Sequence, residues 1–314
     1  MGILLSHTCA YYTLLQQAAS GKGGLVASRV TSTPSFDEQA AGQVKEWLPE
    51  GVGLELLVPN SENRRYSHMK CHVWGDGLPP GSVRKLDNGI YVSSPEFLFL
   101  QMATSLPFVR LVQFGYELCA LYTVRLPNVN YMELKEPLTT QARIAGYLDG
   151  CSGMYGVKQA RKAIPWVLDR SRSPAESDFA ISFTLPRLKG GQAIRGLELN
   201  KEFPLTKKER RTAGKRHYEV DFCFEGIQDA FEYYGADAHE GPIRTVKDIR
   251  RESILKSKGV IVHGITKSQV RNLQELERLA ELVTKARGKR WHRPTRQQEA
   301  AMIRLLDELY PPSR

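Results

Sequence analysis

The residues best suited to chemistry lie in one short stretch, 218–239, which reads YEVDFCFEGIQDAFEYYGADAH. Its alternation predicts two β-strands, and the Gly-Ile pair at 226–227 suits a two-residue hairpin loop, because a type II′ turn prefers glycine first. That loop pairs Asp221 with Glu232. Opposed carboxylates repel each other, so we expect a cation between them. We expect this cation to be Mg2+ (or Mn2+), because such ions are usually bound by carboxylates in proteins. The alternative to a metal site is a solvated polar face with lysine counter-ions.

The same register predicts which side chains share a face of the sheet, because side chains alternate along a strand. One face is expected to be apolar and to carry Tyr218, Val220, Phe222 and Phe224. The other face is expected to be polar and to carry Glu219, Asp221, Glu232 and Tyr234.

The order of these residues resembles that of a nuclease family. An aspartate at a strand end, a hairpin, Glu-x-x-Gly and then His239 is similar to the very-short-patch-repair (Vsr)-like branch of the PD-(D/E)xK nucleases. Upstream, the Ser-Pro-Ala-Glu run ending at Glu176 resembles the opening helix of that family. Downstream, the matches to its next helix and strand are Asp248, Arg251, Leu255, Gly259 and the apolar run 260–262. The resemblance covers residues 150–272.

The resemblance implies a restriction-endonuclease-like core, a mixed sheet flanked by helices, and an endonuclease that hydrolyses phosphodiester bonds of DNA with Mg2+. It makes Asp221 and Glu232 the metal ligands, Glu176 an auxiliary acid and His239 a proton donor or acceptor. Tyr234 stands where the general pattern has lysine, and its hydroxyl could orient a water. Because of Tyr234, the alternative is a catalytically inactive protein, either an AbiEi-like antitoxin or a DNA-binding regulator. Glu176 also has a purely structural interpretation, as part of a helix capping box.

The first part of the chain resembles a second family. The order strand, loop, strand and helix over residues 72–103, with Ser6-His7 near the start, is similar to AbiEi-type antitoxins of bacterial abortive-infection systems. This resemblance covers residues 1–125. We therefore expect an α/β (mixed) protein with an α+β domain at 1–130, the nuclease-like domain at 150–272 and a helical extension at 273–314. The resemblance to the antitoxins implies that the protein is a component of a bacterial phage-defence or toxin–antitoxin system and has a toxin or antitoxin partner protein.

The chain of 314 residues has a formal net charge of +10 and a pI near 9.3, which favours nucleic acid as the partner over a membrane surface. Residues 201–216 hold seven basic and two acidic residues, and we expect a mobile basic loop or a hairpin tip there, the alternative being a disordered solvated loop. The expected nucleic-acid contacts are Lys207, Lys208, Arg210, Arg211, Lys215, Arg216, Arg244, Lys247, Arg250 and Arg251.

The five cysteines are scattered and form no C-x-x-C pair, which is typical of reduced thiols in a cytoplasmic protein. Cys71 and His72 are adjacent in a β-like run, so their side chains point to opposite faces and we expect no zinc site from that pair. The apolar opening residues lack a basic flank, so neither a signal peptide nor a membrane anchor is expected.

Overall fold

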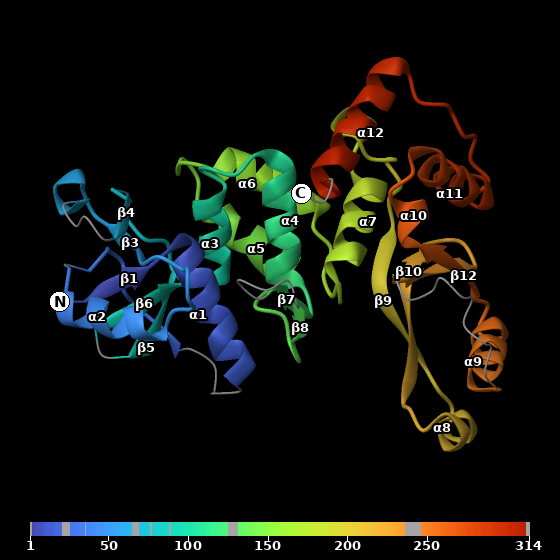
Figure 1. Cartoon of the computed structure of the whole chain (residues 1–314), viewed down its shortest axis with the longest axis horizontal. Coiled ribbons are helices and arrows are strands. Elements are labelled where there is room, and N and C mark those ends of the chain that lie inside the picture. The colour runs from blue at the N-terminus through green and yellow to red at the C-terminus, as the bar shows by residue number, and fades with distance from the viewer. Residues whose placement is uncertain are drawn as a thin grey trace. The chain divides into compact units, whose positions relative to one another are not determined.

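The computed structural model confirms the mixed α/β class predicted from the sequence. It divides into two compact units, Met1–Asp169 and Arg170–Arg314, which are described separately as the first and the second unit (Figure 1). None of the described helices combines the length and the apolar character that a membrane span needs. The structure describes residues 2–20, 26–34, 36–64, 69–75, 77–87, 89–124, 131–235 and 246–311.

A six-stranded mixed sheet forms the centre of the first unit, in the order β2-β5-β6-β1-β3-β4. Strand β1 runs parallel to β6 and antiparallel to β3, and β3 runs parallel to β4. The strands are β1 Ile3–Leu5, β2 Val26–Ala27, β3 Glu55–Val58, β4 Lys70–Val73, β5 Val83–Asp87 and β6 Ile90–Ser93.

Helices and a small two-stranded sheet complete the first unit. Helix α3 begins as its sequence predicts, with Pro95 in its first turn and the Ser94 hydroxyl accepting from the Phe97 amide at 3.2 Å. Helix α6, Val157–Ala163, ends there because Pro165 cannot continue the α-helical hydrogen bonding, and a 3-10 turn follows Ala163. The elements are α1 His7–Ser20, α2 Glu38–Trp47, α3 Pro95–Met102, α4 Phe108–Cys119, β7 Tyr122–Val124, β8 Tyr131–Glu133, α5 Gln141–Asp149 and α6 Val157–Ala163.

The second unit is built on a four-stranded mixed sheet in the order β12-β11-β10-β9. Strands β9, β10 and β11 are antiparallel neighbours, whereas β12 runs parallel to β11 and returns through α9, as the continuous apolar run at 260–262 predicts. The elements are α7 Pro174–Thr184, β9 Leu197–Pro204, α8 Lys207–Ala213, β10 His217–Phe224, β11 Asp229–Tyr234, α9 Val246–Ser257, β12 Ile261–Thr266, α10 Lys267–Val270, α11 Leu273–Ala286 and α12 Arg296–Leu309.

Helices α7 and α9 cover opposite faces of this sheet. The Phe222 ring lies 4.3 Å from the Phe179 ring of α7, centroid to centroid, while its neighbour Cys223 belongs to the buried cluster that contains Leu255 of α9. Because neighbouring residues of a strand point to opposite faces, the two helices sandwich the sheet between them. This is the mixed sheet flanked by helices that the sequence predicts.

The predicted single apolar face of β10 is wrong. Phe222 packs on the α7 side, whereas Tyr218 and Val220 join the cluster on the α9 side. In a regular strand these three alternate residues would share one face. The change of face coincides with Asn200 of β9, whose φ is +48° and which is missing from the β9–β10 register. A left-handed residue interrupts the alternation of a strand, and the paired strand β10 turns with it.

The structure also has a helix in a segment that was expected to be a loop or a hairpin tip. The basic run at 201–216 contains a short helix, α8, because Thr206 and Glu209 form a reciprocal capping box and Gly214 ends the helix at φ +66°. Figure 1 shows α8 at the tip of the long β9–β10 hairpin. Thr266 caps a short helix, α10, that stops at Val270, and Asn272 caps the next helix, α11.

Candidate active site

The hairpin of β10 and β11 has the predicted register. Phe222 pairs with Phe231 and Cys223 pairs with Ala230, and the φ of Gly226 is +81°. Next in that register come Asp221 and Glu232, and the Asp221 carboxylate accepts a hydrogen bond from the Tyr233 amide at 2.9 Å. Asp221 therefore lies between the two strands rather than on an open face.

Burial, and then the neighbouring Glu176 and Glu232 carboxylates, raise the pKa of Asp221 to about 7, although the Tyr233 amide and Arg251 oppose that rise. Like charges and low polarity both disfavour ionisation of this carboxyl group. A carboxyl group that titrates near neutral pH, beside two further acidic residues, is a candidate for binding a cation or for transferring a proton.

Glu176 takes part in a helix cap and also lies near Asp221. It belongs to the cap of α7: its amide donates to the Ser173 hydroxyl at 3.2 Å, and its carboxylate accepts from that hydroxyl at 2.9 Å. Its other oxygen accepts from the Arg172 amide at 2.9 Å and from the Asn200 side chain at 2.7 Å. Burial raises the pKa of Glu176. The helix cap thus also supplies an acidic group that interacts with Asp221.

Arg251 of α9 supplies the positive charge next to Glu232. Its guanidinium donates to both carboxylate oxygens of Glu232, with Nη1 at 2.9 Å from Oε2, and Nη2 also donates to the Glu219 carbonyl at 2.7 Å. Such a bidentate pair is among the stronger hydrogen-bonded ion pairs. Arg251, which we expected to contact nucleic acid, is therefore engaged within the protein.

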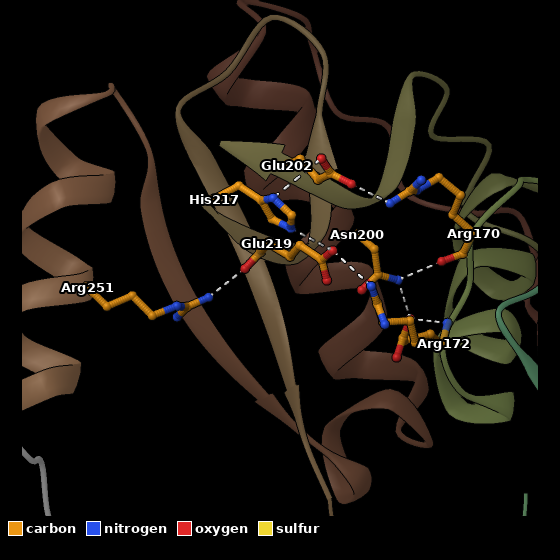
Figure 2. A network of polar contacts seen from close by, with 8 residues as sticks. Arg170, Arg172, Asn200, Glu202, His217, Glu219 and Arg251 are labelled. Atoms are coloured by element: carbon orange, nitrogen blue, oxygen red, sulfur yellow. Dashed lines mark hydrogen bonds and ion pairs between the residues drawn. The ribbon is translucent and has the colours of Figure 1, made fainter. Parts of the chain in front are cut away.

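A second polar cluster lies around Glu219, on the sheet face opposite to Arg251. Arg251 stacks over the ring of Tyr218, at 5.7 Å, so the adjacent Glu219 side chain points to the other face. The predicted common polar face of Glu219 and Glu232 is therefore wrong. Figure 2 shows His217 between Glu202 and Glu219 and shows Arg172 bound to Glu219, at 2.9 Å.

The carboxylates of Glu202 and Glu219 and the His217 ring offer ligand atoms within 4.8 Å of one another, so this cluster could hold a metal ion. His217 Nε2 lies 3.4 Å from Glu219, and Nδ1 lies 3.8 Å from Glu202, which also pairs with Arg170 at 2.7 Å. Nitrogen and oxygen ligands together suit a transition metal better than Mg2+.

Two residues of this region have a left-handed backbone conformation. Among the described residues, four non-glycine residues have a positive φ, and two of them, Arg170 at +70° and Asn200 at +48°, belong to this network. The Asn200 side chain donates to the Arg170 carbonyl at 2.9 Å and to Glu176 at 2.7 Å. Positive φ values of this kind persist where surrounding contacts hold them, and they are enriched at functional sites.

Three other predicted site residues are Tyr234, His239 and Arg244. The Tyr234 side chain is half exposed and packs over Gly264 of β12, where a methyl group would collide with the Tyr234 ring. Tyr234 therefore packs against its neighbouring strand. His239 and Arg244 lie outside the described residues.

Most of the predicted nucleic-acid contacts lie on α8 and α9, which are neighbours. The Arg250 guanidinium of α9 donates to the carbonyl of Thr212 in α8 at 3.4 Å. We call this region the basic surface; its exposed residues are Lys207, Lys208, Arg210, Arg211, Lys215, Arg216, Lys247 and Arg250. Arg210 has an additional structural contact, since its Nε donates to the Leu205 carbonyl at 2.8 Å.

Five residues of this network are not among the site residues predicted from the sequence: Arg170, Arg172, Asn200, Glu202 and His217. Glu202 lies opposite Glu219 across β9 and β10, and His217 lies two residues before Glu219 on β10. Extending the register of that hairpin would therefore have grouped the three residues. The role of Asn200 depends on its backbone conformation and has no local sequence signal.

No family model, no curated protein and no solved structure matches this chain.

Proposed function

We propose that the second unit is a metal-dependent nuclease that hydrolyses phosphodiester bonds, with DNA as its substrate. The observation that carries the proposal is the convergence of Glu176, Asp221 and Glu232 where β10 meets β11, with the pKa of Asp221 raised to about 7. The order of elements, an acidic opening helix, a hairpin, a helix and a parallel strand, supports the resemblance to the PD-(D/E)xK nucleases.

The donor set fits a divalent cation. Asp221 and Glu232 would hold it, because Mg2+ prefers carboxylate oxygens and keeps some of its waters. The cation would relieve the repulsion that raises the pKa of Asp221. Arg251 now binds both oxygens of Glu232, so Glu232 must exchange one of these contacts to act as a ligand.

A bound divalent ion makes its water acidic enough to supply hydroxide near neutral pH and stabilises charge on the phosphate. The protein itself would contribute positive charge near the phosphate groups of the substrate. Arg251 lies beside Asp221 and Glu232, where its charge could also stabilise a phosphate group. The basic surface attracts the phosphate backbone without reading the base sequence.

A second function, a DNA-binding regulator without cleavage activity, is favoured by one observation. The bidentate Arg251–Glu232 pair already gives Glu232 a counter-charge, so this carboxylate does not need a metal as its partner. In either case we propose nucleic acid as the partner, with a cytoplasmic role in a defence or toxin–antitoxin system.

A cleavage and binding experiment on one protein preparation separates the two functions. The full chain is incubated with plasmid, linear and single-stranded DNA and with RNA, in Mg2+, Mn2+ or chelator, and binding is measured at several salt concentrations. The nuclease proposal predicts metal-dependent cleavage of DNA. Tight, salt-dependent binding without cleavage under any condition would support the regulator instead.

Charge reversal on the basic surface tests the partner separately. The tip variant K207E/K208E/R211E changes three exposed residues and leaves the structural contact of Arg210 in place. A matched control, R293E/R296E/R304E, reverses three exposed charges near and on α12. We expect weaker binding to every nucleic acid in the tip variant only. Equal binding by the two variants would contradict the assignment of this surface.

A further inference from the structure

Three side chains from separate segments of the first unit meet beside its sheet. His7 is the first residue of α1, Glu55 begins β3, and His72 lies in β4. His72 Nε2 lies 2.6 Å from Glu55 Oε2, and the rings of His7 and His72 stack with centroids 3.4 Å apart and an interplanar angle of 12°. One ligand atom of each residue lies within 4.8 Å of the others.

His7 has features that packing alone does not explain. It is 8% exposed, its φ is +48°, and its Nδ1 atom has no hydrogen-bond partner among the described residues. Buried polar atoms in native proteins are nearly always bonded, and left-handed backbone at a histidine is uncommon. The combination points to a ligand that is bound by the imidazole.

A cavity opens beside the two histidines. It has a volume of about 330 Å3 and is lined by His7 and His72 together with the polar or aromatic side chains of Trp74, Gln101, Thr104 and Tyr155. A metal held by the three residues would therefore keep access to water or to a small molecule. Zinc sites with three protein ligands and one open position are typical of chemistry at the metal.

We propose that His7, Glu55 and His72 form a Zn2+ site with its open coordination position toward this cavity. Two imidazole nitrogens and one carboxylate oxygen suit Zn2+, whereas Mg2+ prefers oxygen ligands alone. An ion between the side chains would replace the direct His72–Glu55 hydrogen bond. It would also give the imidazole of His7 a binding partner.

The site contains only residues of the first unit and is independent of the proposed nuclease. Cys71, the neighbour of His72 in the sequence, points to the opposite face of the strand and is not part of this site. The partners of His72 come instead from α1 and β3, 65 and 17 positions earlier in the chain (72 − 7 and 72 − 55).

The test measures zinc binding by the full chain. The metal-free protein is titrated with ZnCl2 in competition with a chromophoric chelator, and zinc-edge X-ray absorption counts the imidazole ligands. We expect two imidazoles at the strongest site. His72→Gln should weaken that site at least about tenfold, since loss of even an outer partner of a metal ligand weakens binding 10- to 100-fold.

Two control variants make the result specific. His263→Gln removes a histidine that forms a similar histidine–carboxylate pair, 2.6 Å from Asp229, and His217→Gln tests the Glu202–His217–Glu219 cluster. Neither should change the strongest site. Absence of zinc binding by the unaltered protein, a single imidazole at the metal, or loss of binding in His217→Gln instead of His72→Gln would overturn the proposal. The ligand count of the unaltered protein decides the question even where a variant folds poorly.

Discussion

Replacing Asp221 by asparagine should stabilise the second unit at high pH. The pKa of Asp221 is about 7 in the folded protein instead of 3.8, so the folded state binds the proton more tightly than the unfolded state. Between these two values the unfolded state loses the proton first, and the free energy of unfolding falls as pH rises. The difference corresponds to about 4 kcal/mol above pH 7. Asparagine cannot ionise, and its side-chain oxygen can still accept from the Tyr233 amide.

Urea denaturation of both proteins over the range from pH 4 to pH 8 measures this effect. The gain in the free energy of unfolding of Asp221→Asn over the unaltered protein should grow with pH and reach about 4 kcal/mol at pH 8. Adding Mg2+ at pH 8 should reduce the gain, because a cation stabilises the charged aspartate. A difference that does not change with pH, or a variant that becomes relatively less stable as pH rises, would refute the electrostatic account of this site.

Three further outcomes follow from the side-chain interactions. Arg251→Met should lower the free energy of unfolding by about 2 kcal/mol, because it leaves the partly buried Glu232 carboxylate without its donors; combining it with Glu232→Gln should recover much of that loss in a double-mutant cycle. Ser173→Ala should cost about 1 kcal/mol in thermal or chemical denaturation, since it removes the cap of α7 and a donor to Glu176. In the tip variant, the slope of log affinity against log salt should fall by about 1 for each phosphate group that the altered surface no longer binds, whereas an unchanged slope would place DNA elsewhere.

Local signals in the sequence predicted much of the second unit. The position of Gly226 fixed the hairpin register, and the capping residues Ser173 and Thr266 marked where their helices begin. Helix α8 was missed although Thr206 and Glu209 form a capping box, because the density of charge around them favoured a loop.

The site itself was only partly predictable, because its decisive contacts join distant segments. The charge next to Glu232 comes from Arg251, 19 residues later, and the turn in β10 depends on the positive φ of Asn200 in β9. No periodicity reports either feature. The pairing of Phe222 with Phe231 and of Cys223 with Ala230, next to Asp221 and Glu232, followed from the strand register, which is a local property.

The most direct test of the proposed nuclease is the initial rate of plasmid cleavage in Mg2+ by the unaltered chain, by Asp221→Asn and by Glu198→Gln. Glu198 is the matched control: it is an exposed carboxylate of the neighbouring strand, paired with Lys201 at 2.7 Å, outside the Glu176–Asp221–Glu232 group. We predict cleavage that chelation stops, lost in Asp221→Asn and retained in Glu198→Gln. Equal cleavage by Asp221→Asn and the unaltered chain, or no Mg2+-dependent cleavage at all, would contradict the account.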